Sequence, residues 1–541
     1  MTTTFTGNII NIFDFEIYYG EFTVSKGRIT DIKKLQEEIK TEKYYLPGLI
    51  DAHVHVESSL LTPSNFARMA VVHGTVGSVS DPHEIANVLG LKGVEYMIRD
   101  AHSSPFKFCF GAPSCVPATT FETAGAVINL KETAELLAKK EIGYLAEMMN
   151  YPGVLNEDEV VLEKLKLAKA FNKPVDGHAP GLRGAALIKY ILEGISTDHE
   201  CFKEDEAAEK LKLGMKILIR EGSAAKNFEA LEPLINENYR NMMFCSDDKH
   251  PDSLLIGHIN ELVKRAILKG NNLFKVLQMA CLNPVLHYRM NVGLLREGDL
   301  ADFIVIDSPE NFRVLETYIT GDLVAQNGMT LIPFIESDLI NYFECTPKAA
   351  EDFNLKAEPN QVFSVIEVLD GQLITNKILG KPLIQNGFAI SDLSRDMLKI
   401  AVINRYQAAP IAIGFIHKFG LKVGALASSV AHDSHNIIVV GTNDFYMAEA
   451  VNLIIAEKGG LSVVSEEQKG VLPLPIAGLM SQKDGYKVAQ DYTQIDQFAK
   501  EKMGCTLNSP FMSLSFMALL VIPALKISDK GMFDAEKFEF I

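Results

Sequence analysis

The sequence predicts an α/β protein built on a (β/α)₈ barrel of the TIM type, with a small composite β domain from both flanks and a C-terminal α+β domain. Eight short apolar runs alternate with helical segments between residues 47 and 290, as in a (β/α)₈ barrel. Short β runs with Gly-containing turns flank this region at 1–46 and 291–334. Residues 335–541 are numerous enough to bury a core of their own.

The barrel prediction depends on the spacing of its strands. The eight predicted strands are residues 49–56, 74–80, 106–112, 143–148, 174–179, 194–200, 216–223 and 241–248. The segments between them, such as 129–141 and 157–172, repeat apolar residues at three and four positions, as amphipathic helices do. An open doubly wound sheet is the alternative, but it would require a Gly-rich phosphate-binding turn, and the chain has neither GxGxxG nor GxxxxGK[ST].

The two flanking segments share a pattern of short β runs joined by Gly-containing turns. Residues 1–46 alternate apolar and polar side chains, with Gly20 and Gly27 at expected turns, which predicts a small antiparallel β unit. Residues 291–334 follow a helix and return to β runs with Gly-Asp turns, so we expect the two flanks to pair into one domain. The C-terminal region has strands and helices of its own.

Composition excludes several classes of function. The 541 residues include 52 Lys and Arg against 69 Asp and Glu, a formal charge of −17, which disfavours nucleic acid and anionic membranes as partners. The longest apolar run, 516–525, is half the roughly 20 residues that a spanning helix needs. The N-terminus lacks the features of a secretory signal, and the seven scattered cysteines include no CxxC pair. We therefore expect a cytoplasmic protein with reduced thiols.

Residues of the kinds that bind metals stand at the carboxyl ends of the predicted strands, where barrel enzymes have their active sites. His53 and His55 end the first strand, and residues i and i+2 of a strand face the same side. The other candidates, on strands four, five, six and eight, are Glu147, His178, His199 and Asp247. Each alone could be a structural residue, but their convergence from five strands predicts a site for Zn²⁺, Mn²⁺ or Fe²⁺ with enough donors for two ions.

A second set of polar residues follows the same strand ends and has two interpretations. Asp81 before Pro82 is a good helix start, and His83 or Glu84 could face the substrate or an accessory metal. The remaining candidates for substrate contact or support of the site are Glu57, Ser58, Arg183 and the run 220–223, which includes Glu221. Glu57 and Ser58 could instead belong to an ordinary loop, and the arginines could form structural ion pairs.

Several motifs in order along the chain resemble one family. The run PGLIDAHVHVESS (47–59) is similar to the first-strand signature of the amidohydrolase superfamily. The strings that follow resemble the adenine deaminase family in particular: DPHEIANVLG, AEMMN, DGHAPGLRG, STDHE, IREGSAAKN, FCSDDKHPDSL, INRY and SSVAHDSHN. The resemblance covers nearly the whole chain and is far more specific than a single HxH motif.

The resemblance implies hydrolysis of adenine to hypoxanthine and ammonia at a binuclear centre, with Mn²⁺ expected and Fe²⁺ or Zn²⁺ as alternatives. By position, His53, His55 and Asp247 would hold one ion, and His178 and His199 the other. Many relatives in the superfamily bridge their metals with a carboxylated lysine on strand four. The segment AEMMN has no lysine, so Glu147 would take that place.

The same resemblance suggests which groups move protons. Asp247 would take the proton of the attacking water and relay it toward the departing amine. Ring nitrogen N1 also needs an acid, for which Glu200 and Asp248 are both candidates. The alternatives to adenine deamination are hydrolysis of a cyclic amide or urea, as in dihydroorotases and hydantoinases, and an inactive scaffold. We also expect a homodimer.

The C-terminal region contains an unusual turn. Residues 423–430 and 436–441 are predicted strands, and the connection between them carries His432, Asp433 and His435. A solvent-exposed hairpin would usually have Asn, Gly or Ser here. A small planar base at a barrel mouth needs a cover that excludes water, so we expect this loop to close over the substrate.

Overall fold

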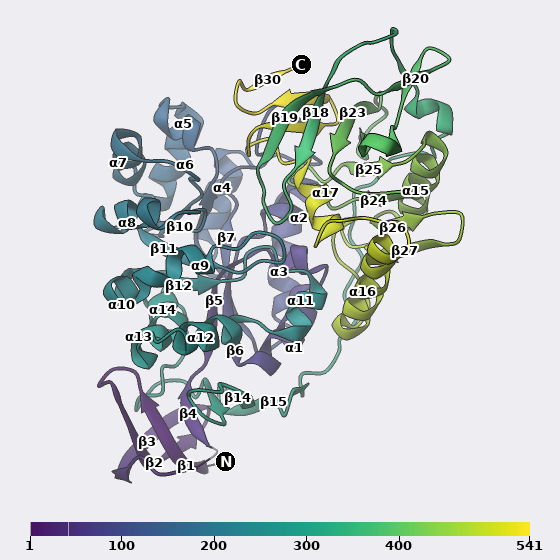
Figure 1. Cartoon of the computed structure of the whole chain (residues 1–541). Helices are drawn as coiled ribbons and strands as arrows, with labels where there is room; N and C mark the ends of the chain where they lie inside the picture. Colours follow the sequence, from purple (N-terminus) through teal and green to yellow (C-terminus); the bar gives the residue numbers. More distant parts are fainter. Residues whose placement is uncertain (1, 42) are drawn as a thin grey trace.

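The computed structural model describes residues 2–41 and 43–541 and shows three parts (Figure 1). The composite β domain lies at one end, the barrel in the middle, and the C-terminal domain beside the opposite end of the barrel. The predicted fold class is confirmed.

The barrel contains the eight predicted strands. They are β5 (Leu49–Val54), β6 (Thr75–Ser80), β7 (Lys107–Ala112), β8 (Ile142–Met148), β9 (Val175–Gly177), β10 (Thr197–Asp198), β11 (Lys216–Arg220) and β12 (Met242–Cys245). All run parallel, in one group of five strands and one of three. The later strands are shorter than predicted because regular pairing stops before the polar residues at their ends.

Isolated parallel bridges join the two groups into a closed ring. Val175 pairs with Ile195 between β9 and β10, and Val54 pairs with Asp247 between β5 and the residues after β12. At the second seam, the Asp247 amide donates to the His53 carbonyl over 2.9 Å. The inside of the barrel is packed by Ala52, Val79, Tyr144, Leu218 and Met243, so its centre is a core and not a channel.

Helices surround the barrel, and side chains cap the starts of α4, α5, α6 and α13. Helix α4 starts after Asn129, whose side chain accepts hydrogen bonds from the amides of Lys131 and Glu132. The side chain of Glu132 in turn accepts from the Asn129 amide, which completes a capping box. The other helices of this part are α1 (Pro63–Ala70), α2 (His83–Leu89), α3 (Leu91–Ala101), α5 (Tyr151–Leu155), α6 (Glu159–Ala170), α7 (Gly184–Leu192), α8 (Glu204–Lys212), α9 (Phe228–Leu231), α10 (Ile235–Asn238), α11 (Pro251–Ile256), α12 (Ile259–Leu268), α13 (Leu273–Leu277) and α14 (Asn283–Tyr288). Helix α4 itself is Leu130–Ala138.

Strands from both flanks of the barrel form one eight-stranded sheet in the order β16-β15-β14-β13-β4-β1-β2-β3. Its strands are β1 (Thr2–Asn11), β2 (Glu16–Ser25), β3 (Arg28–Glu37), β4 (Tyr44–Pro47), β13 (Phe303–Ile306), β14 (Val314–Ile319), β15 (Asp322–Gln326) and β16 (Met329–Thr330). The N-terminal unit is not wholly antiparallel as predicted, because β4 pairs parallel with β1 before it leads into the barrel. The ring of Phe303 lies 5.1 Å from that of Phe22, so aromatic packing joins the two flanks.

The C-terminal domain is built on a second eight-stranded sheet, in the order β19-β18-β23-β22-β25-β24-β26-β27. These strands are β18 (Phe363–Val368), β19 (Thr375–Gly380), β22 (Met397–Ile403), β23 (Ala412–His417), β24 (Ala425–Ser428), β25 (Ile437–Gly441), β26 (Gly460–Val464) and β27 (Lys469–Pro473). Two small sheets contain β17 (Leu355–Lys356), β20 (Leu383–Gln385), β21 (Phe388–Ile390), β28 (Leu525–Ser528), β29 (Gly531–Asp534) and β30 (Glu539–Phe540). The helices are α15 (Asp444–Glu457), α16 (Gly485–Glu501) and α17 (Pro510–Phe516).

Specific contacts hold this domain against the carboxyl end of the barrel. Arg68 of α1 pairs with Asp484 at the start of α16 over 2.5 Å, and His250 Nδ1 lies 2.6 Å from the Tyr492 hydroxyl. The amide of Ser481 donates to the carbonyl of Leu60. The loop between β24 and β25 is thereby held at the barrel mouth.

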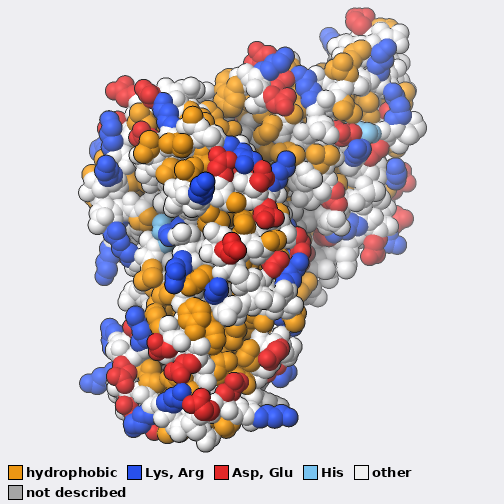
Figure 2. Space-filling model, turned by 60° about the vertical axis from the view of Figure 1, so that its left-hand side comes forward, with side chains coloured by type: hydrophobic (Ala, Val, Ile, Leu, Met, Phe, Trp, Pro, Cys, Tyr) orange, Lys and Arg blue, Asp and Glu red, His pale blue; other side chains and the backbone are white. Residues whose placement is uncertain are grey.

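The surface charges agree with the expectation that nucleic acid and anionic membranes are poor partners. Acidic and basic side chains are interspersed on the face in Figure 2, with no gathered basic patch. Among the residues that the structure describes, no helix has both the length and the apolar composition needed to span a membrane. All seven cysteines are free thiols.

Candidate metal centre

The six predicted ligands converge at the carboxyl end of the barrel. His53 and His55 lie at the end of β5 and Glu147 in β8, and the other three directly follow β9, β10 and β12. All six are buried, with at most 7% of their surface exposed: His53, His55, Glu147, His178, His199 and Asp247. So many polar groups are costly to bury unless something binds them, and this cluster is compatible with metal binding.

One group of ligand atoms surrounds a point beside β5. His55 Nε2 lies 3.2 Å from His53 Nε2 and 3.2 Å from Asp247 Oδ1. The distance from His53 Nε2 to Asp247 Oδ1 is 3.8 Å. Asp247 has a φ of +53°, a left-handed conformation that Asp tolerates better than most residues.

A second group lies on the other side of Glu147. Glu147 Oε2 is 2.8 Å from His178 Nδ1 and 3.1 Å from His199 Nε2, whereas Oε1 is 3.4 Å from His55 Nε2. The two oxygens of this carboxylate therefore face two separate groups of imidazoles. This is the arrangement expected of a carboxylate that bridges two cations.

The donor set fits divalent metals by chemistry and spacing. Ligands about 2.1 Å from one ion are separated by about 3.0–3.4 Å in octahedral or tetrahedral geometry, which is close to the separations given above. Burial and the neighbouring His199 and His55 hold the pKa of His53 well below its usual value, so this imidazole has a lone pair to donate. Burial opposes the charge on Glu147, but His178 and His199 keep its pKa well below the usual range. The chain thus has a divalent-metal site.

Surrounding groups orient the ligands. His55 Nδ1 lies 3.2 Å from the carbonyl oxygen of Asp81, which can only accept, so Nδ1 carries the proton and Nε2 is free to bind a metal. Asp51 accepts from the Ser246 amide over 2.9 Å and from His258 Nε2 over 2.8 Å, beneath the seam between β5 and β12. These buried bonds fix the strand end that carries the two histidines.

The cluster after β6 lies beside the metal ligands. Asp81 Oδ2 is 3.0 Å from His83 Nδ1, and Asp81 Oδ1 accepts from the His83 amide over 3.1 Å. Asp81 supports the start of α2 as expected, although the helix begins at His83 and Pro82 is its N-cap, one position later than predicted. Glu57 Oε1 accepts from the Ile85 amide over 3.1 Å, so Glu57 supports this helix start too. Burial raises the pKa of Glu57 to about 7.

The loop between β24 and β25 reaches this cluster. His432 Nδ1 and His435 Nε2 each contact one oxygen of Glu84, and His83 Nε2 lies 3.6 Å from Asp433 Oδ1. The cavity over the metal ligands is lined by His432 and Asp433 together with the strand-end residues. The structure therefore brings the C-terminal loop to the barrel mouth.

The two carboxylates proposed as acids occupy different environments. Both oxygens of Glu200 receive N–H groups of the buried Arg220, which also donates to Asp247 Oδ2 over 2.6 Å. Asp248 accepts from the Ser58 hydroxyl over 2.5 Å, and burial raises its pKa. Ser58 therefore supports the site through Asp248.

Two candidates for substrate contact form ion pairs, the alternative that the sequence left open. Arg183 lies on the surface, where it pairs with Asp205 over 2.5 Å and Glu209 over 2.6 Å. Glu221 pairs with Arg265 over 2.8 Å. Side chains alternate along β11, so Arg220 faces the site and its neighbour Glu221 faces away.

The apolar lining of the cavity is not predicted by the sequence. Leu373, Phe516 and Leu519 of the C-terminal domain line it, and the Phe516 ring stacks on His432 with centroids 5.0 Å apart. Met149 and Arg220 line it from the barrel. The sequence does show the apolar run that begins at Phe516. An apolar run alone, however, does not distinguish the wall of a cavity from ordinary core.

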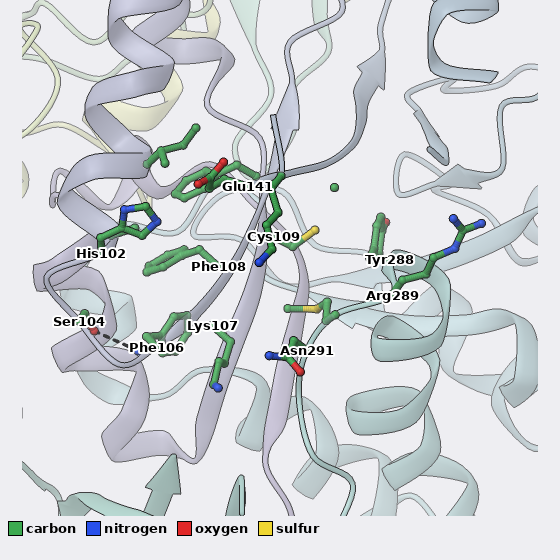
Figure 3. Close-up of a pocket in the computed structure, with 16 residues that line it drawn as sticks. His102, Ser104, Phe106, Lys107, Phe108, Cys109, Glu141, Tyr288, Arg289 and Asn291 are labelled. Carbon is green, nitrogen blue, oxygen red and sulfur yellow. Dashed lines mark hydrogen bonds between the residues drawn. The ribbon is translucent and has the colours of Figure 1, made fainter. Parts of the chain in front are cut away.

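A different pocket opens beside β7 and is lined by Phe106, Phe108 and Arg289 (Figure 3). It lies where β7 and β8 begin, at the opposite end of the barrel from the metal ligands. Active sites of barrel enzymes lie at the carboxyl ends of the strands, so this pocket is not the candidate catalytic site.

Comparisons with known proteins cover both large parts of the chain. Residues 44–324 match the amidohydrolase family, and residues 372–539 match the adenine deaminase C-terminal domain. The adenine deaminase of Sulfurovum sp. (strain NBC37-1) is 53% identical over 538 residues, 99% of this chain and 98% of that protein. The adenine deaminase of Methanosarcina mazei is 50% identical over 99% of this chain and 98% of its own length. A solved β-aspartyl dipeptidase of Fervidobacterium islandicum aligns with 61% of this chain and 98% of its own, with 16% identity and a TM-score of 0.47.

Removal of the charge on Glu147 tests its place between two ions. We expect about two Mn²⁺ per chain in the wild type and about one in Glu147→Gln, because a neutral amide cannot balance two dications. Elemental analysis after reconstitution measures this, with Glu157→Gln on the surface as the matched control. Two ions retained by Glu147→Gln would remove this residue from the bridge.

Proposed function

Because the chain belongs to the adenine deaminase family of the amidohydrolase superfamily, we propose that it hydrolyses adenine to hypoxanthine and ammonia at the metal centre. The observation that carries this proposal is the contact of the C-terminal loop with Glu84 beside the ligands. The part of the chain that matches the adenine deaminase C-terminal domain thereby forms one wall of the cavity.

The proposed centre holds two Mn²⁺ ions, with Fe²⁺ or Zn²⁺ as alternatives that the same donors accept. His53, His55 and Asp247 would hold one ion, His178 and His199 would hold the other, and Glu147 would lie between them. When bound, such ions supply an activated water at neutral pH. The chain itself positions the base and moves the protons.

Asp247 is the proposed proton acceptor. Its Oδ1 faces the first metal group and its Oδ2 is held by Arg220, so the carboxylate is fixed at the edge of the site. It takes a proton from the attacking water and passes it to the departing amine as C6 loses its amino group.

Asp248 is the proposed acid for ring nitrogen N1. Both oxygens of Glu200 are engaged by Arg220, whereas Asp248 accepts from the Ser58 hydroxyl, lies 4.0 Å from His432 Nε2 and lines the cavity. Glu200 then serves to hold Arg220 against Asp247. A partly buried carboxyl group with a raised pKa is better suited to donate a proton than one whose two oxygens are both held by an arginine.

Hydrolysis of a cyclic amide or urea is less well supported. Dihydroorotases and hydantoinases bridge their metals with a carboxylated lysine, whereas the residue at the proposed bridging position of this chain is Glu147. An inactive scaffold is disfavoured because all six ligand positions are filled and face one another. The proposal also includes a cytoplasmic location, a homodimer and domain limits at 1–46, 47–290, 291–334 and 335–541.

The direct test is turnover of adenine by the Mn²⁺-reconstituted protein, followed by release of ammonia and the ultraviolet spectrum of hypoxanthine. We expect activity in the wild type and a loss of at least ~10³-fold in Asp247→Asn with the fold retained, because an amide cannot accept the proton. Dihydroorotate is the comparison substrate. Turnover of dihydroorotate but not adenine would overturn the proposal, and activity of Asp247→Asn within tenfold would reassign the proton acceptor.

The pH dependence tests the role of Asp248. A raised pKa keeps a carboxyl group protonated to higher pH, so kcat/KM should fall as pH rises through the pKa of Asp248. This basic limb should vanish from the residual activity of Asp248→Asn and persist in Glu200→Gln. The reverse result would make Glu200 the acid.

The C-terminal loop can be tested separately from the metals. Replacement of His432 and His435 by Ala removes both contacts with Glu84, and we expect kcat/KM to fall by ~10²-fold or more while metal content stays normal. Matched replacement of His102, which is exposed on the barrel, should have no effect. Full activity of the double variant would show that the loop does not position the base.

A further inference from the structure

The loop at the barrel mouth contains a carboxylate oxygen without a partner. Asp433 is 3% exposed and lines the cavity over the metal ligands. Its Oδ1 faces His83 Nε2, but Oδ2 has no hydrogen-bond partner among the residues that the structure describes. A buried carboxylate oxygen left unpaired is costly, so its retention needs a reason.

None of the surrounding side chains that the structure describes donates a hydrogen bond to this oxygen. His83 uses Nδ1 for Asp81, and His432 and His435 both contact Glu84. Glu122 is also close to Asp433, and burial raises the pKa of Glu122 to about 8. The Glu122 Oε1 atom accepts from the Thr119 hydroxyl over 3.1 Å. The free oxygen of Asp433 is thus placed to accept from a group that enters the cavity.

Adenine can provide a donor at this distance from the metals. His83 separates Asp433 from the bridging carboxylate, with 3.6 Å from its Nε2 to Asp433 Oδ1 and 3.5 Å from its Nδ1 to Glu147 Oε1. Asp433 therefore lies beyond His83 on the wall of the cavity, away from the bridging carboxylate. With C6 and its amino group at the metals, the remaining N–H group of adenine is on the five-membered ring.

We propose that Asp433 accepts a hydrogen bond from the five-membered-ring N–H of the free base and thereby excludes purines substituted at N9. This inference rests on the proposed adenine deaminase function. A substituent at N9 removes the N–H donor and places carbon against the Asp433 carboxylate. The buried Phe516 and Leu519 line the same cavity with apolar side chains.

The size of the expected effect follows from the chemistry. A site built to bind a substrate N–H or O–H rejects an analogue that lacks it by about 10⁴–10⁵-fold, because the buried partner stays unpaired. Adenine and 9-methyladenine form such a pair, since methylation removes the N–H and adds little volume. Their ratio of kcat/KM therefore measures the contribution of Asp433.

The experiment compares both substrates in the Mn²⁺-loaded wild type and in Asp433→Ala and Asp433→Asn. We expect the wild type to favour adenine by at least ~10³-fold and Asp433→Ala by no more than ~10-fold, since Ala removes the acceptor and adds space. Asp433→Asn keeps an acceptor oxygen of similar shape and should retain an intermediate preference. Asp496→Asn, the same change at a buried carboxylate of α16, is the matched control and should behave as wild type.

Metal content and the melting temperature show whether each variant is folded. A ratio in Asp433→Ala equal to that of the wild type would overturn the inference, as would efficient turnover of 9-methyladenine by the wild type. If Asp433→Ala does not fold, the test uses the ratio of kcat/KM for adenine to that for 9-methyladenine in Asp433→Asn. A ratio equal to that of the wild type in this variant would contradict the inference. Absence of adenine turnover by the wild type would instead overturn the proposed function.

Discussion

The site depends on the closure of the barrel between its first and last strands. The backbone of Asp247 pairs with that of β5 at this seam, through bonds with His53 and His55. Asp51 reinforces the seam from below through Ser246 and His258. The two histidines and the aspartate of one metal group are therefore brought together by the same hydrogen bonds that close the ring.

Glu147 connects this group to the rest of the site. Its two oxygens point to different imidazole clusters, so one side chain from the opposite side of the barrel sets the separation of the two proposed ions. A glutamate is permanently a carboxylate at neutral pH, whereas a lysine must first be carboxylated to take that place. The proposed bridge therefore requires no modification of the chain after folding.

The C-terminal domain completes the cavity and is not a separate module. His432 contacts Glu84, which is 348 positions earlier in the chain, and Phe516 stacks on His432. Glu84 stands in the first turn of α2, whose start is supported by Asp81 and Glu57. A substrate at the barrel mouth is consequently enclosed by both domains, which agrees with the full-length similarity to adenine deaminases.

The sequence by itself determined the barrel, its strand order and the candidate ligands, because these depend on local periodicity. Alternation along β5 places His53 and His55 on one side, and the alternation of apolar strands with helices brings all strand ends to one edge. The same local rule could not distinguish Arg220 from Glu221, because the register of β11 is fixed by its neighbours in the ring. The apolar residues Leu373, Phe516 and Leu519 have no chemical signature, so only packing shows that they line a cavity. Tertiary structure alone decided which buried charges pair across the two domains, since contacts between residues hundreds of positions apart leave no periodic pattern in the chain.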